Sequence, residues 1–202
     1  MVKVYAIDGV TPVVDPTAFV HPTASLIGDV VIGPECYVGP GASIRADFGR
    51  FEMGPGSNFQ DNCTAHGFSG EDIIIGANCN IGHGAVIHGA VLHDRVLVGM
   101  NAVVMDGVVL HDDVLVAALA FIPAAMEVPP GVIVAGTPAK ILRELTDEEK
   151  QWKVAGNRDY HNLTMRCHAT LNEVEALTEL DRPLPRLKMQ GSKPLYKTRE
   201  DT

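Results

Sequence analysis

Three histidines have the residue type and spacing of a divalent metal site. They are His66, His83 and His88, which lie within 23 consecutive residues. Imidazole is the usual nitrogen ligand of zinc, and a site with three protein ligands leaves a fourth position open for water. Water bound to such a cation ionises near neutral pH and becomes a hydroxide nucleophile. These residues therefore predict hydrolysis or hydration chemistry, provided that the fold brings them together.

A repeat of six residues identifies the elements that must position these histidines. Apolar residues recur every six positions over most of the chain, as in Val20, Leu26, Ile32, Val38 and Ile44. A residue that is usually small follows each of them four positions later. A period of six is neither the 3.6 of a helix nor the 2 of an ordinary strand. The alternative fold, a β-sandwich, would instead show alternation and a turn signal every 8–12 residues.

The period resembles the hexapeptide repeat of left-handed parallel β-helix proteins, in which three hexapeptides form one triangular coil. The seventeen repeats between Val20 and Ile122 predict an all-β solenoid of five to six such coils. Stacked coils bury the apolar column, and each coil pairs only with its neighbours. Cys36, Cys63 and Cys79 fall on the small interior position, where a thiol acts as a small apolar group.

The register of the repeat places the histidines on two faces. His66 and His88 each follow an apolar position, and removing a four-residue insertion from their separation leaves 18 residues, or one coil. They should share a face at the strand spacing of about 4.8 Å. His83 lies in another hexapeptide and therefore on another face. A metal site would then take His66 and His88 from one chain and His83 from its neighbour, which predicts a homotrimer with closed symmetry.

The chain is expected to divide into a β-helix domain over residues 1–142 and a C-terminal helix with a basic tail over residues 143–202. Thr146 and Glu149 form the T-x-x-E pattern of a capping box, which predicts that a helix begins there and extends to about Ala169.

Composition excludes several classes of protein. The net charge is −9, from 16 Lys and Arg against 25 Asp and Glu, which argues against nucleic-acid binding. The longest apolar run, Val114 to Met126, contains Pro123 and is too short to span a bilayer. None of the four cysteines forms a C-x-x-C pair. The N-terminal segment carries Asp8 where a signal peptide would have an apolar core. We therefore predict a cytoplasmic protein without disulfides or a membrane segment.

Three motifs resemble those of the γ-class carbonic anhydrase-like family of hexapeptide-repeat proteins. They are R-A-D at residues 45–47, Q-D-N-C-T-A-H at 60–66 and I-G-H-G-A-V-I-H at 81–88. The resemblance covers roughly residues 4–190 and is specific at the three histidines. It implies a divalent metal, most commonly zinc with iron or cobalt as alternatives, bound by His66, His83 and His88 across a trimer interface.

The same resemblance implies roles for five further residues. Arg45 and Asp47 match a salt bridge that supports the interface. Gln60 matches a residue that orients metal-bound water, and Asp61 matches a nearby acidic partner. Tyr160, on the predicted helix, matches a side chain that reaches over some family sites. From the residues alone, Arg45 and Asp47 could equally brace a trimer, and Asp61 could be a turn residue or a hydrogen-bond acceptor for a ligand histidine.

The chain resembles in particular the members of this family that act in phenylacetate catabolism, and this resemblance implies that it is a thioesterase. In that reading, metal-bound hydroxide attacks the carbonyl of an acyl-CoA thioester at the trimer interface. Phe48 and Phe68 would line an aromatic acyl pocket, or would be ordinary packing residues.

Three other functions remain open, and two of them are enzymatic. Carbonic anhydrase activity is disfavoured because Phe48 stands where the archetype has an acidic residue, and the loop that should carry the proton shuttle offers only Glu71 and Asp72. A CoA-dependent acyltransferase would use a histidine as general base. A scaffold trimer would bind metal without turnover.

Overall fold

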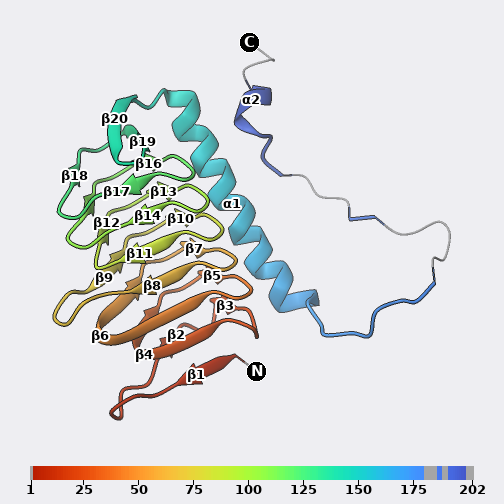
Figure 1. Cartoon of the computed structure of the whole chain (residues 1–202). Helices are drawn as coiled ribbons and strands as arrows, with labels where there is room; N and C mark the ends of the chain where they lie inside the picture. Colours follow the sequence, from red (N-terminus) through yellow and green to blue (C-terminus); the bar gives the residue numbers. More distant parts are fainter. Residues whose placement is uncertain (1, 180–185, 188–190, 199–202) are drawn as a thin grey trace.

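The computed structural model describes residues 2–179, 186–187 and 191–198, and it shows a parallel β-solenoid followed by one long helix (Figure 1). The described residues form about seven turns with three faces. Among them, no helix is both long enough and apolar enough to cross a membrane.

Each face is a stack of short strands that pair with the turn above and the turn below. The first face contains β1 (Lys3–Tyr5), the first part of β4 (Ser25–Ile32), the first part of β6 (Ser43–Met53), β8 (Thr64–His66), β11 (Val86–His88), β14 (Val103–Val104) and β17 (Phe121–Ile122). The second contains β2 (Val13–Val14), the later parts of β4 and β6, β9 (Ile73–Ile75), β12 (Val91–Leu92), β15 (Val109–Leu110) and β18 (Glu127–Val128).

The third face ends in the one antiparallel pair among these strands. It contains β3 (Phe19–Val20), β5 (Tyr37–Val38), β7 (Asn58–Phe59), β10 (Asn80–Ile81), β13 (Leu97–Val98), β16 (Leu115–Val116) and β19 (Val132–Gly136). The next strand, β20 (Ala139–Glu144), turns back antiparallel to β19. The predicted domain boundary between residues 142 and 143 lies within β20.

The apolar residues that recur every six positions form the core of the solenoid, as predicted. Leu92, Val98 and Leu110 are completely buried, and β12 and β15 align Leu92 with Leu110, 18 residues later. The small interior position is filled as expected, because Cys63 and Cys79 are buried free thiols. An apolar column with small residues beside it lets successive turns stack without voids.

The prediction of five to six coils was too low, because the period extends further at both ends. Val14 lies six residues before Val20, and Val128 and Val134 continue the series after Ile122. Val128 and Val134 are completely buried, although prolines around them obscure the pattern. The first turn has no turn beneath it, so β1 is exposed and shows no buried period.

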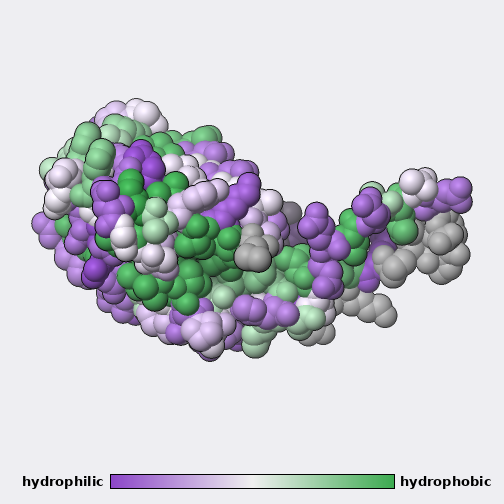
Figure 2. All heavy atoms as spheres, turned by 90° about the horizontal axis from the view of Figure 1, so that it is seen from below, coloured by the Kyte–Doolittle hydropathy of each residue, from purple (hydrophilic) through white to green (hydrophobic). Residues whose placement is uncertain are grey.

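That unpaired end leaves apolar side chains on the surface. Val4, Tyr5, Ile7, Val10 and Val13, all in the first turn, are each at least 39% exposed. Figure 2 views the molecule from this end and shows hydrophobic residues gathered across it.

Helix α1 (Asp147–Thr170) begins as the capping box predicts. The Thr146 hydroxyl accepts the Glu149 N–H, and the Glu149 carboxylate accepts the Thr146 N–H. The helix runs along the side of the solenoid (Figure 1), and its buried residues are polar: Glu149, Lys153, Asn157 and Thr164.

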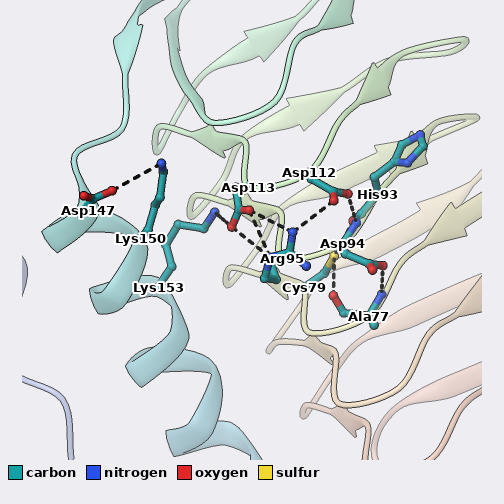
Figure 3. A network of polar contacts seen from close by, with 10 residues as sticks. All are labelled: Ala77, Cys79, His93, Asp94, Arg95, Asp112, Asp113, Asp147, Lys150 and Lys153. Carbon is teal, nitrogen blue, oxygen red and sulfur yellow. Dashed lines mark hydrogen bonds and ion pairs between the residues drawn. The ribbon is translucent and has the colours of Figure 1, made fainter.

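Polar contacts therefore hold α1 in place. Asn157 Nδ2 donates to the carbonyl oxygen of Gly56 at 3.0 Å. Figure 3 shows Lys153 pointing from α1 to Asp113, with Nζ 3.5 Å from Oδ1. Arg95 of the solenoid also donates to Asp113, so this carboxylate is shared by one cation of the helix and one of the solenoid. The remaining described helix, α2 (Leu195–Thr198), is one short turn.

Candidate functional site

His66 and His88 lie side by side on the first face of the solenoid. Strands β8 and β11 pair in parallel and align the two residues directly. His66 Nδ1 is 3.3 Å from His88 Nε2. Two nitrogens bound to one zinc at about 2.0–2.1 Å and a tetrahedral angle are also about 3.3 Å apart. The pair is therefore spaced as two ligands of one cation.

An aspartate holds the other nitrogen of each ring. His66 Nε2 is 3.1 Å from Asp47 Oδ1, and His88 Nδ1 is 2.5 Å from Asp106 Oδ1. A carboxylate on the far nitrogen is the usual support of a metal-binding histidine, because it fixes the tautomer and the ring orientation. Sequence reasoning missed Asp106. The available signal was its position 18 residues after His88, which is one turn of the solenoid.

The expected ion pair between Arg45 and Asp47 is present. Burial opposes ionisation of Asp47, but hydrogen bonds from Arg45 and His66 outweigh it and hold the pKa of Asp47 below its ordinary value. Asp47 is therefore an anion that accepts from both partners.

His83 lies apart from this pair, in the turn after β10. Its Nδ1 is 2.8 Å from Asp61 Oδ2, and its Nε2 is 3.4 Å from the hydroxyl of Tyr160. Gln60 accepts the backbone N–H of His83 at 3.2 Å through Oε1, and its amide donates to Asn58. The structure thus brings Gln60, Asp61, His83 and Tyr160 together in a second cluster.

Tyr160 is half-buried, and this position affects its hydroxyl. Desolvation, aided by the charge of Asp61, raises the pKa of Tyr160 above its usual range. The phenol therefore keeps its proton at neutral pH and remains a hydrogen-bond donor.

The chain thus carries two separate groups of predicted site residues. Arg45, Asp47, His66 and His88 form one, and the cluster around His83 forms the other. Within the described residues, no three His, Cys, Asp or Glu side chains are arranged to hold a metal ion. The three histidines therefore do not form a complete site within one chain.

Two exposed aromatic rings flank the histidine pair. The ring of Phe48 lies 5.5 Å from that of His66, and the ring of Phe68 lies edge-on to His88 at 5.2 Å between centroids. Phe48 is 55% exposed and Phe68 is 62% exposed, so neither belongs to the core.

The buried cysteines do not belong to either group. Desolvation raises the pKa of Cys36 and of Cys63 to about 11, and that of Cys79 to about 12. Thiols in this state are poor nucleophiles at neutral pH.

Comparison with known proteins agrees with the repeat. A family model described as the hexapeptide repeat of succinyl-transferase matches residues 72–106 and 93–118. A hexapeptide transferase family protein from Anaplasma phagocytophilum has a similar structure, with a TM-score of 0.78 and 35% identity over 81% of this chain and 96% of that one. A Bacillus cereus protein provisionally named an acetyltransferase shares the fold, with a TM-score of 0.81 and 24% identity over 83% of this chain and 98% of that one.

The motifs around the histidines predict a likeness to the phenylacetic acid degradation protein PaaY and to its relative, the carnitine operon protein CaiE. The relationship to CaiE is confirmed: the chain is 46% identical to CaiE of Escherichia coli O157:H7 over 183 residues, which are 91% of this chain and 93% of that protein. The likeness to PaaY stays a prediction. The chain belongs to the hexapeptide-repeat family that includes CaiE.

Proposed function

We propose that this protein is a metal-dependent hydrolase of acyl-CoA thioesters, with sites shared between the chains of a homotrimer. One observation carries the proposal. His66, His83 and His88 each direct one ring nitrogen to an aspartate. The other nitrogen of each ring is thereby left in the tautomer that can bind a cation.

The position of His83 favours a site between chains. The paired nitrogens of His66 and His88 supply two ligands, and the fold holds His83 in the separate cluster. A neighbouring chain related by closed threefold symmetry could supply His83 at each interface, which would give three equal sites. The donor set of three imidazoles suits zinc, with iron or cobalt as alternatives.

When bound, such a cation would supply Lewis-acid activation of water for attack on the thioester carbonyl. The chain's own residues would orient the reactants. The Oε1 atom of Gln60 is held by the His83 N–H and has a second lone pair to accept a hydrogen bond from water. The Tyr160 hydroxyl can donate to an oxygen that gains negative charge. Asp47, Asp61 and Asp106 fix the three rings, and Arg45 braces Asp47.

The surroundings of the histidine pair favour a thioester over carbon dioxide. Rapid hydration of carbon dioxide needs an efficient proton shuttle, and the phenyl ring of Phe48 occupies the position of the archetype's acidic residue. Phe48 and Phe68 instead offer an apolar surface beside His66 and His88.

An acyltransferase is the second candidate, because a structural neighbour is described as a hexapeptide transferase family protein. A transferase would release CoA faster when an amine or hydroxyl acceptor is added, whereas a hydrolase would not.

The direct test is release of free thiol from phenylacetyl-CoA and a panel of acyl-CoA esters, before and after chelation and again after zinc is restored. Release without an acceptor that disappears on chelation and returns with zinc is the expected result. Metal-replete protein that releases no thiol from any ester would refute the proposal.

A mixing experiment tests the sharing of the site. His66→Ala and His83→Ala chains should each be inactive alone. After unfolding and refolding together in equal amounts, about a quarter of the interfaces should combine intact halves and recover activity, since each interface draws one half-site from each of two chains. Mixtures that stay inactive although they assemble would show that each site uses one chain only.

A further inference from the structure

A cleft of about 440 Å³ lies between α1 and the third face of the solenoid. Its walls are largely apolar and include Leu97, Leu115 and Trp152, and the cleft reaches His83 and Tyr160 of the second cluster. A cleft of this size that is mostly apolar and has a few polar groups is typical of a site for a small organic ligand.

Gly156 lies in the middle of α1 and lines the same cleft. Glycine is among the poorest helix formers, and a Cβ added at Gly156 would meet no atom within 4 Å. By contrast, a Cβ at Gly99, on the opposite wall, would lie only 2.4 Å from the backbone of Ala118. Gly156 therefore borders open space, and a larger side chain at this position would take up part of the cleft.

The Lys153 side chain also borders the cleft, but its charge is directed elsewhere. Its ammonium points toward Asp113 on the solenoid (Figure 3), and Lys153 also lines a smaller cavity together with Arg95 and Asn157. The cleft thus has one polar end at His83 and Tyr160, with apolar walls beyond it.

The segment after the helix contributes to the cleft as well. Leu195 lines it, and Trp152 Nε1 donates to the carbonyl oxygen of Lys193 at 3.0 Å. Ser192 is held by Asp159 of α1. Residues 192–195 therefore lie against α1 close to the cleft.

We propose that this cleft binds the acyl group of the substrate, and that the substrates are CoA thioesters with an apolar acyl group of medium length. This inference rests on the proposed function for the thioester, and it assigns the acyl group to the chain that supplies His83. The polar end formed by His83, Gln60 and Tyr160 would hold the thioester carbonyl. The apolar walls would hold the hydrocarbon, which becomes buried away from water.

Binding can be measured without turnover. Trp152 is the only tryptophan in the chain, so its fluorescence reports on the cleft. The full-length protein is first treated with chelator and then titrated with octanoyl-CoA, acetyl-CoA and CoA. We expect octanoyl-CoA to change the emission of Trp152 and to bind at least about tenfold more tightly than CoA or acetyl-CoA, since several buried methylenes favour binding.

Variants that fill the cleft test its position. Gly156→Leu should weaken octanoyl-CoA binding at least about tenfold, because its side chain would occupy the cleft. Ala117→Leu, on the opposite wall, should do the same. Asn162→Leu places the same side chain on an exposed position of α1 outside the cleft, and it should bind as the unmodified chain does. Thermal unfolding of each variant checks that it is folded.

Either of two binding results would overturn the inference. One is octanoyl-CoA binding no tighter than CoA, and the other is undiminished binding by both folded leucine variants. The assay contains no metal, so failure of the thioesterase assay would leave it unaffected. Conversely, metal-dependent thiol release that the leucine variants do not alter would refute the cleft assignment and leave the proposed function standing.

Discussion

Single aspartates determine what the three histidines can do. A neutral imidazole has one donor nitrogen and one acceptor nitrogen, and a carboxylate beside the ring fixes which is which. Asp47, Asp61 and Asp106 each lie within 3.1 Å of one ring nitrogen of a predicted ligand. The sequence indicated Asp47 and Asp61, because both belong to recognisable motifs. It did not indicate Asp106, whose role depends on a neighbour one turn away.

Asp106 should therefore be needed for metal affinity. We expect Asp106→Asn to weaken zinc binding about 10–100-fold, as loss of a supporting carboxylate does in other sites. Competition with a chromophoric chelator measures the affinity. Glu52→Gln, an exposed charge change on β6, should leave the affinity unaltered. Equal affinities for all three proteins would contradict a supporting role for Asp106.

The buried thiols predict a loss of stability in alkali. Burial raises the pKa of Cys36 and Cys63 to about 11, whereas thiols in the unfolded chain ionise near 9. The unfolded state therefore binds fewer protons than the native state between these values, and the free energy of unfolding falls as the pH rises from about 9 to about 11. Urea unfolding across this range should show the fall, and replacing both cysteines with alanine should reduce it. A free energy independent of pH would contradict this assignment.

Among the secondary-structure elements, local sequence signals predicted where α1 begins. Polar contacts between residues far apart in the sequence could not be predicted. The capping box predicted the start of α1 at Thr146, because its two hydrogen bonds lie within four residues. The attachment of α1 to the solenoid could not be predicted. Asn157 and its acceptor, Gly56, are 101 residues apart, and a helix whose buried residues are polar gives no apolar stripe.

The junction of α1 with the solenoid should depend on Asp113. Asp113→Asn would leave the buried Lys153 ammonium without its anionic partner, so we expect a loss of at least about 2 kcal/mol. Lys153→Met removes the buried charge itself and should cost less, because Asp113 keeps Arg95 as a partner. Urea unfolding compares the two variants. A greater loss for Lys153→Met would show that the lysine contributes mainly through its packing.

Gly156 should lower the stability of α1. We expect Gly156→Ala to raise the free energy of unfolding by about 0.5–1 kcal/mol, because alanine favours the helix and its Cβ meets no neighbour. Thermal and urea unfolding measure the change. A destabilised Gly156→Ala variant would imply a contact at this position that the structure does not contain.

At the scale of the whole molecule, periodicity was enough for the solenoid and for the placement of His66 beside His88. It was insufficient for the number of turns, because the first turn is exposed on one side and carries no buried column, and because prolines obscure the buried period after Ile122. The cleft beneath α1 could not be predicted from the sequence either. It depends on how a helix from the end of the chain lies against strands formed some 50 residues earlier.

A site divided between chains links metal binding to assembly, and this link can be measured. If each cation takes His83 from one chain and the His66–His88 pair from another, metal binds the assembled state only. Zinc at 100 times its dissociation constant would then stabilise each interface by about 2.7 kcal/mol. We expect analytical ultracentrifugation to detect dissociation at a markedly higher protein concentration in chelator than in zinc. His83→Ala chains should dissociate at the same protein concentration in chelator and in zinc, because their interfaces lack one of the three metal-binding imidazoles. An association equilibrium of the unmodified chain that zinc does not alter would place all ligands of the metal within one chain.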